Sequence, residues 1–464
     1  MAIFNVINFT QLEGALRMEA EFYKPDDLIM LNKLRSLGSK ELGNYCIFIK
    51  KGIFDLPPSY YTSDGIPLIR TTEIKSMIAD LSSVARIPFS IHSFHLKTEL
   101  EAKDIVFTKI GANIGDISIL PSTEKVYNFS QNVAGAKIDR KKIMPEYLVC
   151  FLSTKYGRFQ IKRIQMLSGQ GKLELVDIKK ILILPASYEL QKNIADIYNL
   201  AENFLVLAKE QYVQAEQLLL SELGLRDWKP RHTLTYVRSF NQVAKASRMD
   251  AEHFHPKYKE LRNIIRNYSG GYLRLIDIAV NSNETIEPRT NPEHNFKYIE
   301  LADIDQNIGV IENAKTIKGK NAPSRARMLL RNGDVIASSV EGSLDKVALV
   351  SEEYDGAIGS TGFFVLRPRT VSSGYLLALI KSMIVREQMH CESSGTILAA
   401  VPAKSLKNII VPNIQQEIQD AISSLVQQSL AAKREAKTLL EKAKRAVEIA
   451  IEYGEQQAMD FLCK

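Results

Sequence analysis

The chain has 464 residues, a length that suits two folded domains with connecting elements better than a single core. Basic residues outnumber acidic ones by 7, a small excess of the sign that nucleic-acid binders carry. No apolar run approaches the roughly 18–20 residues of a membrane span, and the start lacks a secretion signal, so we expect a cytoplasmic protein. The four cysteines form no close pair, which argues against a disulfide framework or a zinc ribbon.

The chain contains an internal repeat. The sequence Arg-Met-Glu-Ala-Glu at residues 17–21, followed by Pro25, recurs as Arg-Met-Asp-Ala-Glu at residues 248–252, followed by Pro256. Further matches follow in the same order, up to an apolar segment that ends in proline in both copies. Because the residues between these matches differ freely, we interpret the repeat as one scaffold that carries two surfaces for different ligands. The alternative is an old duplication without functional meaning.

Each copy predicts the same order of elements: a short helix, a strand-rich body and a long helix. The short helices carry apolar residues at helical spacing, namely Leu28, Leu31 and Leu34 in the first copy and Tyr258, Leu261 and Ile265 in the second. Strand-like runs separated by turn residues cover residues 67–70, 105–109, 117–120 and 181–184 in the first body, and residues 297–300, 335–338, 347–350, 363–366 and 408–411 in the second. We therefore predict an α+β fold with two tandem domains.

Sustained heptad patterns predict a long helix at the end of each copy. The first, over residues 189–223, would be roughly 50 Å long at about 1.5 Å per residue. Equivalent helices related by a pseudo-two-fold axis meet naturally as an antiparallel coiled coil. The residues that we expect at their interface are Ile194, Ile197, Ala201, Phe204, Ile418, Ile422, Leu425, Ala432, Ala436 and Leu439. The alternative is that each helix lies on its own lobe.

The sequence offers no convincing catalytic, cofactor or metal motif. The Gly-Lys step at residues 169–172 lacks the earlier glycine of a phosphate-binding loop, because Met166 stands there. Asp64, Glu73 and Lys75 have the residue types of a metal-dependent nuclease, but the second copy does not keep the lysine. We therefore predict no catalytic residue, no metal site and no cofactor.

Positive side chains among turns and small residues remain as candidate functional groups. Lysine and arginine neutralise DNA phosphates or reach guanine edges, and the sequence does not separate these two roles. The candidates for DNA contact are Lys50, Lys51, Arg70, Lys109 and Lys172 in the first copy, and Lys297, Arg325, Arg327 and Lys346 in the second. For any single one of them, a solvated surface charge is the competing interpretation.

The combined pattern resembles the DNA-specificity subunits of type I restriction-modification systems. The resemblance covers essentially the whole chain. It is carried by two bodies that each end in an apolar strand, a proline and a long helix, at residues 184–194 and 411–418, and by the connector at residues 223–228. It implies two target-recognition domains that each read one half of a split DNA site, with the antiparallel helices setting the spacer.

The resemblance also implies that catalysis belongs to partners. These are methyltransferase subunits, which modify adenine in double-stranded DNA, and a restriction subunit that translocates DNA; no membrane is involved. On this interpretation residues 1–186 form the first target-recognition domain, 187–230 the first long helix and connector, 231–412 the second domain, and 413–464 the second long helix and a tail. The alternatives are a self-contained DNA methyltransferase or nuclease with degenerate motifs, and a coiled-coil scaffold protein.

Overall fold

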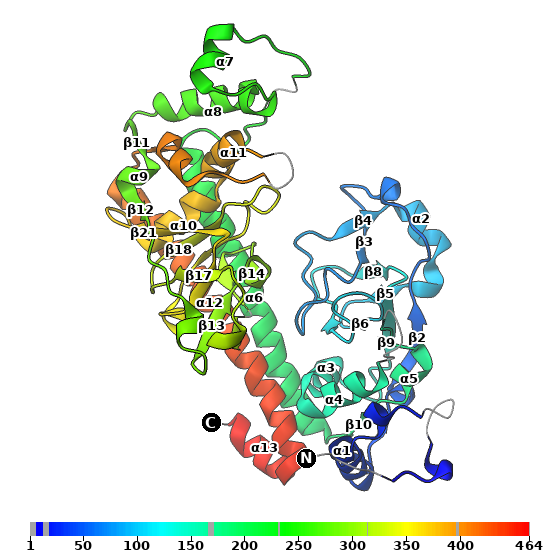
Figure 1. Cartoon of the computed structure of the whole chain (residues 1–464). Coiled ribbons are helices and arrows are strands. Elements are labelled where there is room, and N and C mark those ends of the chain that lie inside the picture. The colour runs from blue at the N-terminus through cyan, green and yellow to red at the C-terminus, as the bar shows by residue number, and fades with distance from the viewer. Residues whose placement is uncertain are drawn as a thin grey trace. The chain divides into compact units, whose positions relative to one another are not determined.

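The computed structural model describes residues 6–12, 18–165, 171–230, 233–312, 314–395 and 399–463. The chain divides into two compact units, whose elements are labelled in Figure 1. Unit 1 comprises Met1–Phe204 and Arg434–Lys464, and unit 2 comprises Leu205–Lys433. Unit 1 contains the first body (residues 40–186), and unit 2 contains the second body (residues 272–412).

A short helix leads into each body. Both α1 (Pro25–Ser36) and α8 (Pro256–Arg266) begin with proline at the first helical position, where a backbone N–H would have no partner in the helix. Their buried side chains are Leu31 and Leu34 in α1, and Tyr258, Leu261 and Ile265 in α8. In unit 2, α7 (Phe240–Ala246) precedes α8. The apolar periodicity of the sequence therefore marks the face that each helix turns to its body.

Two four-stranded sheets form the first body. One is antiparallel throughout and has the order β2 (Cys46–Lys51), β9 (Val133–Ile138), β6 (Ile105–Thr108) and β7 (Ile117–Ile119). The other has the order β4 (Ala85–Ile87), β3 (Ile66–Ile69), β8 (Val126–Phe129) and β5 (Leu100–Glu101), with β3 and β8 parallel. β1 (Lys40–Glu41) pairs with β10 (Leu182–Ile183). The core joins both sheets, because Ile69 and Phe129 pack in one cluster with Val106 and Val133.

The second body repeats this topology strand for strand. Its antiparallel sheet has the order β12 (Ala279–Asn281), β21 (Phe363–Pro368), β18 (Val335–Ser338) and β19 (Val347–Leu349). Its other sheet has the order β16 (Lys315–Lys318), β13 (Asn295–Ile299), β20 (Ile358–Ser360) and β17 (Ala326–Leu329), and β13 and β20 are its parallel pair. β11 (Tyr272–Arg274) pairs with β22 (Ile410–Pro412), and the second body also has the pair β14 (Ile304–Asp305) and β15 (Val310–Ile311).

Two consecutive helices follow the sheets in each body: α3 (Pro145–Ser153) and α4 (Lys155–Ile164) in the first, and α10 (Ser373–Lys381) and α11 (Met383–Glu392) in the second. The remaining helices of the bodies are α2 (Phe89–Phe94), α5 (Leu175–Lys179) and α9 (Leu275–Ile278). In Figure 1, α3, α4 and α5 lie at one end of the first body, whereas β3, β4 and α2 lie at the other.

A buried glutamine holds the last short strand of each body. Gln160 in α4 donates to the carbonyl of Leu182 at 2.9 Å and accepts from the Leu182 N–H at 2.7 Å. Gln388 in α11 makes the same two bonds to Ile410, at 2.8 and 3.0 Å. Each amide also donates to the carbonyl four residues before it in its own helix. One side chain therefore satisfies both polar groups of a strand residue that lies against the helix.

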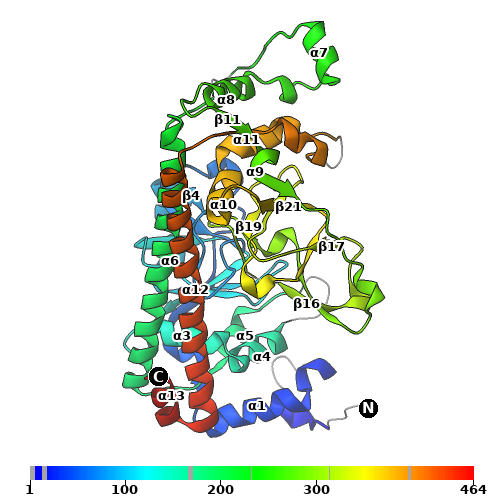
Figure 2. The same cartoon turned by 90° about the vertical axis from the view of Figure 1, so that its left-hand side faces the viewer.

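The two long helices, α6 (Tyr188–Glu222) and α12 (Gln416–Tyr453), each belong to both units. α6 begins in unit 1 and ends in unit 2, whereas α12 begins in unit 2 and ends in unit 1, so the two run in opposite directions. Their unit 2 segments lie side by side (Figure 2). There the Ser429 hydroxyl donates to the Ala208 carbonyl at 2.6 Å. The Ala208 carbonyl is within reach of this buried serine because the two backbones are close.

The chain after α12 turns back as a helix. Gly454, with φ of 101°, ends α12 in a conformation that favours glycine, and α13 (Glu455–Leu462) follows. Within unit 1 the Glu455 carboxylate accepts the Ser187 N–H at 2.9 Å, and the Asn193 amide lies 3.4 Å from the Met459 sulfur. The end of the chain therefore packs on the beginning of α6.

The sequence prediction of an α+β fold is confirmed. The predicted strand-like runs all overlap strands, and α6 spans residues 188–222 where 189–223 was expected. The prediction missed the helix pairs α3–α4 and α10–α11, and it missed several strands at the edges and in the middle of the sheets, among them β4, β8, β9 and β20. Ser168 and Gly169, which the sequence matched to Ser394 and Gly395, lie outside the described residues.

Candidate nucleic-acid interface

Three of the candidate lysines gather at one end of the first body, and we call them the lysine cluster. Lys51 is the last residue of β2, beside the beginning of β9. Lys109 follows β6, and its N–H donates to the Asn132 carbonyl, also at the beginning of β9, at 2.9 Å. Lys172 lies opposite Ile110 in an isolated antiparallel bridge. Three segments far apart in the sequence thus bring one ammonium group each to the same place.

The charges of the cluster act on one another. The pKa of Lys109 is lowered, first by burial and also by the positive charges of Lys51 and Lys172, while Glu174 acts in the opposite direction. Glu174 pairs with Lys172 at 2.6 Å, but both side chains are about half exposed, so water screens this pair. The cluster is therefore a site where positive charge exceeds negative charge.

The other candidates of the first body serve contacts within it. The Lys50 ammonium donates to the Lys97 carbonyl at 3.0 Å and lies over the Phe48 ring. Arg70 binds Glu73, with 2.8 Å between guanidinium nitrogen and carboxylate oxygen, and this bond raises the pKa of Arg70. Because the Glu73 side chain is only 1% exposed, losing Arg70 would leave a buried carboxylate without its counter-charge.

The four candidates of the second body are spread over separate elements. Lys297 in β13 donates to the Glu353 carbonyl at 2.6 Å, and Lys346 donates to the Ile304 carbonyl at 2.9 Å. Arg327 forms an ion pair with Glu287 at 2.5 Å. Arg325 is exposed at the beginning of β17, and its carbonyl accepts the Thr361 N–H.

The second body has no lysine at the positions that correspond to the cluster. When the two bodies are aligned by their strand registers, Asn283 is equivalent to Lys51, Ser339 to Lys109 and Ala400 to Lys172. The backbone is nevertheless the same: the Ser339 N–H donates to the Gly362 carbonyl at 2.8 Å, as that of Lys109 does to Asn132. Both bodies thus present one framework with different side chains.

The expected helix-interface residues divide into two groups. Ile194, Ala201, Ile422, Ala432 and Ala436 are buried, whereas Ile197, Phe204, Ile418, Leu425 and Leu439 are partly exposed. The bond between α6 and α12 involves Ser429 and Ala208, two positions of the heptad series that were not among the ten expected ones. The assignment of the ten residues to a shared interface stays a prediction.

Sequence reasoning missed two lysines that fasten the bodies to the long helices. In unit 1, Lys103 of the first body bonds to Glu202 of α6 at 2.6 Å. In unit 2 the lysine is on the helix and the acids are on the body: Lys433 of α12 bonds to Asp305 and Glu312 of the second body at 3.1 and 2.8 Å. Only tertiary structure brings these groups together, so no local sequence signal could have found them.

The repeated motif near the start of each copy leaves apolar side chains exposed. Val6, Phe9 and Met18 are 87%, 66% and 75% exposed, and the matching Val237, Phe240 and Met249 are 90%, 85% and 88% exposed. Exposed apolar groups of this kind are typical of surfaces that bind another protein. The two copies of the repeat therefore expose the same apolar side chains at matching positions.

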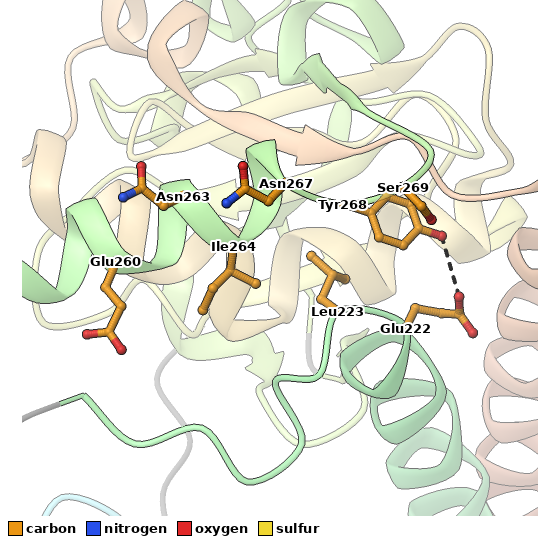
Figure 3. Close-up of a pocket in the computed structure, with 8 residues that line it drawn as sticks. All are labelled: Glu222, Leu223, Glu260, Asn263, Ile264, Asn267, Tyr268 and Ser269. Carbon is orange, nitrogen blue, oxygen red and sulfur yellow. Dashed lines mark hydrogen bonds between the residues drawn. The ribbon is translucent and has the colours of Figure 1, made fainter.

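A cavity of about 590 Å³ lies between the end of α6 and α8 (Figure 3). Glu222 and Glu260 line it together with uncharged residues, and Tyr268 donates a hydrogen bond to Glu222 across it at 3.4 Å. Two carboxylates without a lining cation repel phosphate, so we do not assign DNA to this cavity.

The structure gives Glu73, one of the suspected nuclease residues, another role. Glu73 accepts the Arg70 N–H at 2.7 Å, and its counterpart Asp303 accepts the Glu300 N–H at 2.8 Å, so each acid closes a turn. Within the described ranges, no group of three His, Cys, Asp or Glu side chains is arranged to hold a metal ion. The Gly-Lys step at residues 169–172 lies partly outside those ranges.

Comparison with known proteins finds a family match. Residues 58–217 match the type I restriction modification DNA specificity domain. The match spans 160 of the 464 residues, about a third of the chain. No curated protein matches it. The match covers the first body from η4 (Pro58–Tyr60) onward and most of α6.

Solved structures of specificity subunits resemble the chain weakly. The S subunit from M. genitalium is 12% identical, with a TM-score of 0.37 over 91% of this chain and 95% of that one. The HsdS subunit from Thermoanaerobacter tengcongensis is 16% identical, with a TM-score of 0.30 over 90% and 96%. A chain from a structure of type I complex assembly is 17% identical, with a TM-score of 0.30 over 90% and 97%.

The matched family is described as a DNA specificity domain of type I restriction modification. The family match thus favours DNA recognition over the alternatives of a self-contained enzyme and a scaffold. Among the residues that the structure describes, no helix combines the length and apolarity that a membrane crossing needs.

Proposed function

We propose that this chain selects the target of a type I restriction-modification complex by reading a split DNA sequence, one half with each body. The observation that carries the proposal is the identical strand order of the two bodies, combined with unlike side chains at matching positions. A shared framework presents each recognition surface in the same way, and different side chains on it read different bases. Since the substrate is genomic or incoming DNA, we place the chain in the cytoplasm.

In this proposal the domains run as residues 1–186, 187–230, 231–412 and 413–464, with the second and fourth segments forming the spacer. A rigid spacer is supported by the length of α6 and α12, 35 and 38 residues, and by their contact at Ser429. Helices of that length extend roughly 50–57 Å, more than the 34–36 Å of one DNA turn. The gap between the half-sites would then depend on helix length.

We assign catalysis to methyltransferase subunits and a restriction subunit that bind this chain. The twice-repeated exposed apolar surface supports two copies of one partner, because the same side chains recur while the bodies differ. Replacing Val6 and Phe9 by serine, or Val237 and Phe240, should each weaken the binding of one methyltransferase copy. Phe94→Ser, at an equally exposed site without a repeat, is the matched control. Unchanged stoichiometry and affinity in both double variants would refute this surface.

The function is tested by mapping methylated sites. The chain alone, mixed with DNA and labelled methyl donor, should transfer nothing. Adding the methyltransferase subunit should give adenine methylation at a two-part motif with a constant gap, which sequencing of the modified bases detects. A single uninterrupted motif would contradict the split reading, and transfer by the chain alone would favour a self-contained methyltransferase.

A further inference from the structure

Main-chain hydrogen bonds fix the positions of the three residues of the lysine cluster. The Leu173 N–H donates to the Lys109 carbonyl at 3.0 Å, which fixes the segment of Lys172 beside the end of β6. Lys51 is held by the ladder between β2 and β9. The three Cα positions are thus set by main-chain hydrogen bonds, and the ammonium groups share the same region.

The surroundings of the cluster suit a large anion. The turn from β6 to β7 beside it includes three small exposed residues, Gly111, Ala112 and Asn113, which leave room for a broad ligand. The exposed ring of Phe54 lies under the Lys51 ammonium, with 5.5 Å between nitrogen and ring centroid. Among the described residues, Glu174 is the acid that offsets the charge of Lys109, one carboxylate against three cations.

The fold itself does not need these charges. In the second body the same main-chain bonds form around Ser339, where the Val401 N–H donates to the Ser339 carbonyl at 2.8 Å. Asn283, Ser339 and Ala400 occupy the cluster positions there, and Glu341 stands where the first body has Gly111. Since an uncharged set supports the same backbone, the fold does not require the three lysines of the first body.

We propose that Lys51, Lys109 and Lys172 form a phosphate-binding site for the DNA backbone that is specific to the first body. The second body has no equivalent site and holds its half of the target through other groups. This inference rests on the proposed function, because it names phosphodiester groups of the DNA target as the ligand. Each lysine that contacts a phosphate displaces condensed counterions, which makes its contribution visible as salt dependence.

The test is equilibrium binding of the full chain to a fluorescent 40-base-pair duplex of mixed sequence over a range of KCl concentrations. The triple variant K51Q/K109Q/K172Q should lower the slope of log affinity against log salt by about 2–3, and affinity near 0.1 M salt should fall roughly 100-fold. The matched control replaces three second-body lysines, Lys315, Lys318 and Lys320, by glutamine, because each of them already pairs with a carboxylate. Its slope should change by less than about 1.

The outcomes separate the two proposals. If the wild-type chain binds the duplex and the triple variant keeps its slope, or if the control loses as much, the phosphate site is refuted and the proposed function stands. If the wild-type chain does not bind DNA at low salt, the proposed function itself fails. Should the triple variant unfold, K51Q/K172Q changes only exposed side chains and should lower the slope by about 2, and an unchanged slope overturns the inference.

Discussion

The first and second bodies carry different side chains at positions where their main chains make the same hydrogen bonds. At the end of β6 and of β18 the main chain makes matching hydrogen bonds, yet it carries Lys109 in the first body and Ser339 in the second. At the end of β2 the first body carries Lys51, and the second body carries Asn283 at the equivalent position after β12. The framework is held by main-chain and buried groups, so the exposed positions can change without altering it. This separation is what a molecule with two different half-sites needs.

The groups that hold the framework are matched in both bodies. Asp104 and Asp334, both 1% exposed, each accept a backbone N–H three residues before them, from Glu101 at 2.8 Å and from Arg331 at 3.0 Å. A buried carboxylate in this place closes the turn that leads into the central strand. The comparison therefore predicts equal effects for changes to the framework and unequal effects for changes to the surface.

The largest effect is expected for the buried glutamines. Gln160→Leu and Gln388→Leu leave both backbone groups of a strand residue without a partner, so each should lower the free energy of unfolding by roughly 2–4 kcal/mol. Urea unfolding measures this, with circular dichroism for the whole chain and Trp228, the one tryptophan, for unit 2. A clear loss in one variant and none in the other would break the equivalence of the bodies.

The next effect concerns the lysines that fasten the bodies. Lys433→Met leaves Asp305, whose side chain is 10% exposed, without this partner, and Lys103→Met does the same to Glu202, at 12%. Each should cost about 2–3 kcal/mol, since an unpaired buried charge is expensive. Lys444→Met, which breaks a pair whose carboxylate partner Glu441 is 58% exposed, is the control and should cost under about 1 kcal/mol. Costs as small as that of the control would show that these bonds do not secure the bodies.

A pH effect on stability should arise at Lys381 in unit 2. Burial lowers the pKa of Lys381 to about 8 from its ordinary 10.5, although Asp305 and Glu216 oppose the shift; the first body has Ser153 at this position. As the pH rises, Lys381 therefore loses its proton in the folded chain before it does in the unfolded chain. Burying the charged ammonium destabilises the fold fully below pH 8, and this destabilisation decreases between pH 8 and 10.5. Relative to Lys381→Met, wild-type stability should rise by about 1–3 kcal/mol from pH 7.5 to 10. A parallel pH profile in both proteins would contradict this, and Ser153→Ala should show no such trend.

The smallest effect separates two arginines that sequence reasoning treated alike. Arg70→Gln should cost about 1–2 kcal/mol, because Glu73 is buried. Arg327→Gln breaks a pair whose two side chains are 43% and 39% exposed and should cost under about 0.5 kcal/mol. Equal costs in thermal unfolding would show that burial of the acid does not distinguish these pairs.

The sequence was sufficient for features that depend on periodicity and repetition. The heptad pattern located α6 within one residue at each end, and the repeat indicated two bodies of one topology. The helix pair α3–α4 was missed because nearly all of α3 is buried, so its sequence lacks the polar face that reveals a helix. Edge strands such as β4 have three residues, too few for a recognisable alternation.

The candidate site was predicted only in part. Nine basic residues were proposed, and three of them, Lys51, Lys109 and Lys172, lie together, because the strand order β2–β9–β6 and the bridge to Lys172 unite distant segments. The sequence shows that Glu73 lies three residues after Arg70, but not that the two side chains form an ion pair or that Glu73 is buried. That the lysine is on the body at Lys103 and on the helix at Lys433 depends on packing alone.

Exchange of residues 40–186 for the corresponding body of another specificity subunit tests the central claim most directly. The exchanged chain, combined with its methyltransferase subunit, is used to methylate genomic DNA, and the modified sites are sequenced. The account predicts that one half of the target changes while the other half and the gap stay as they were. A target that changes in both halves, or in neither, would contradict the separate reading of the two half-sites.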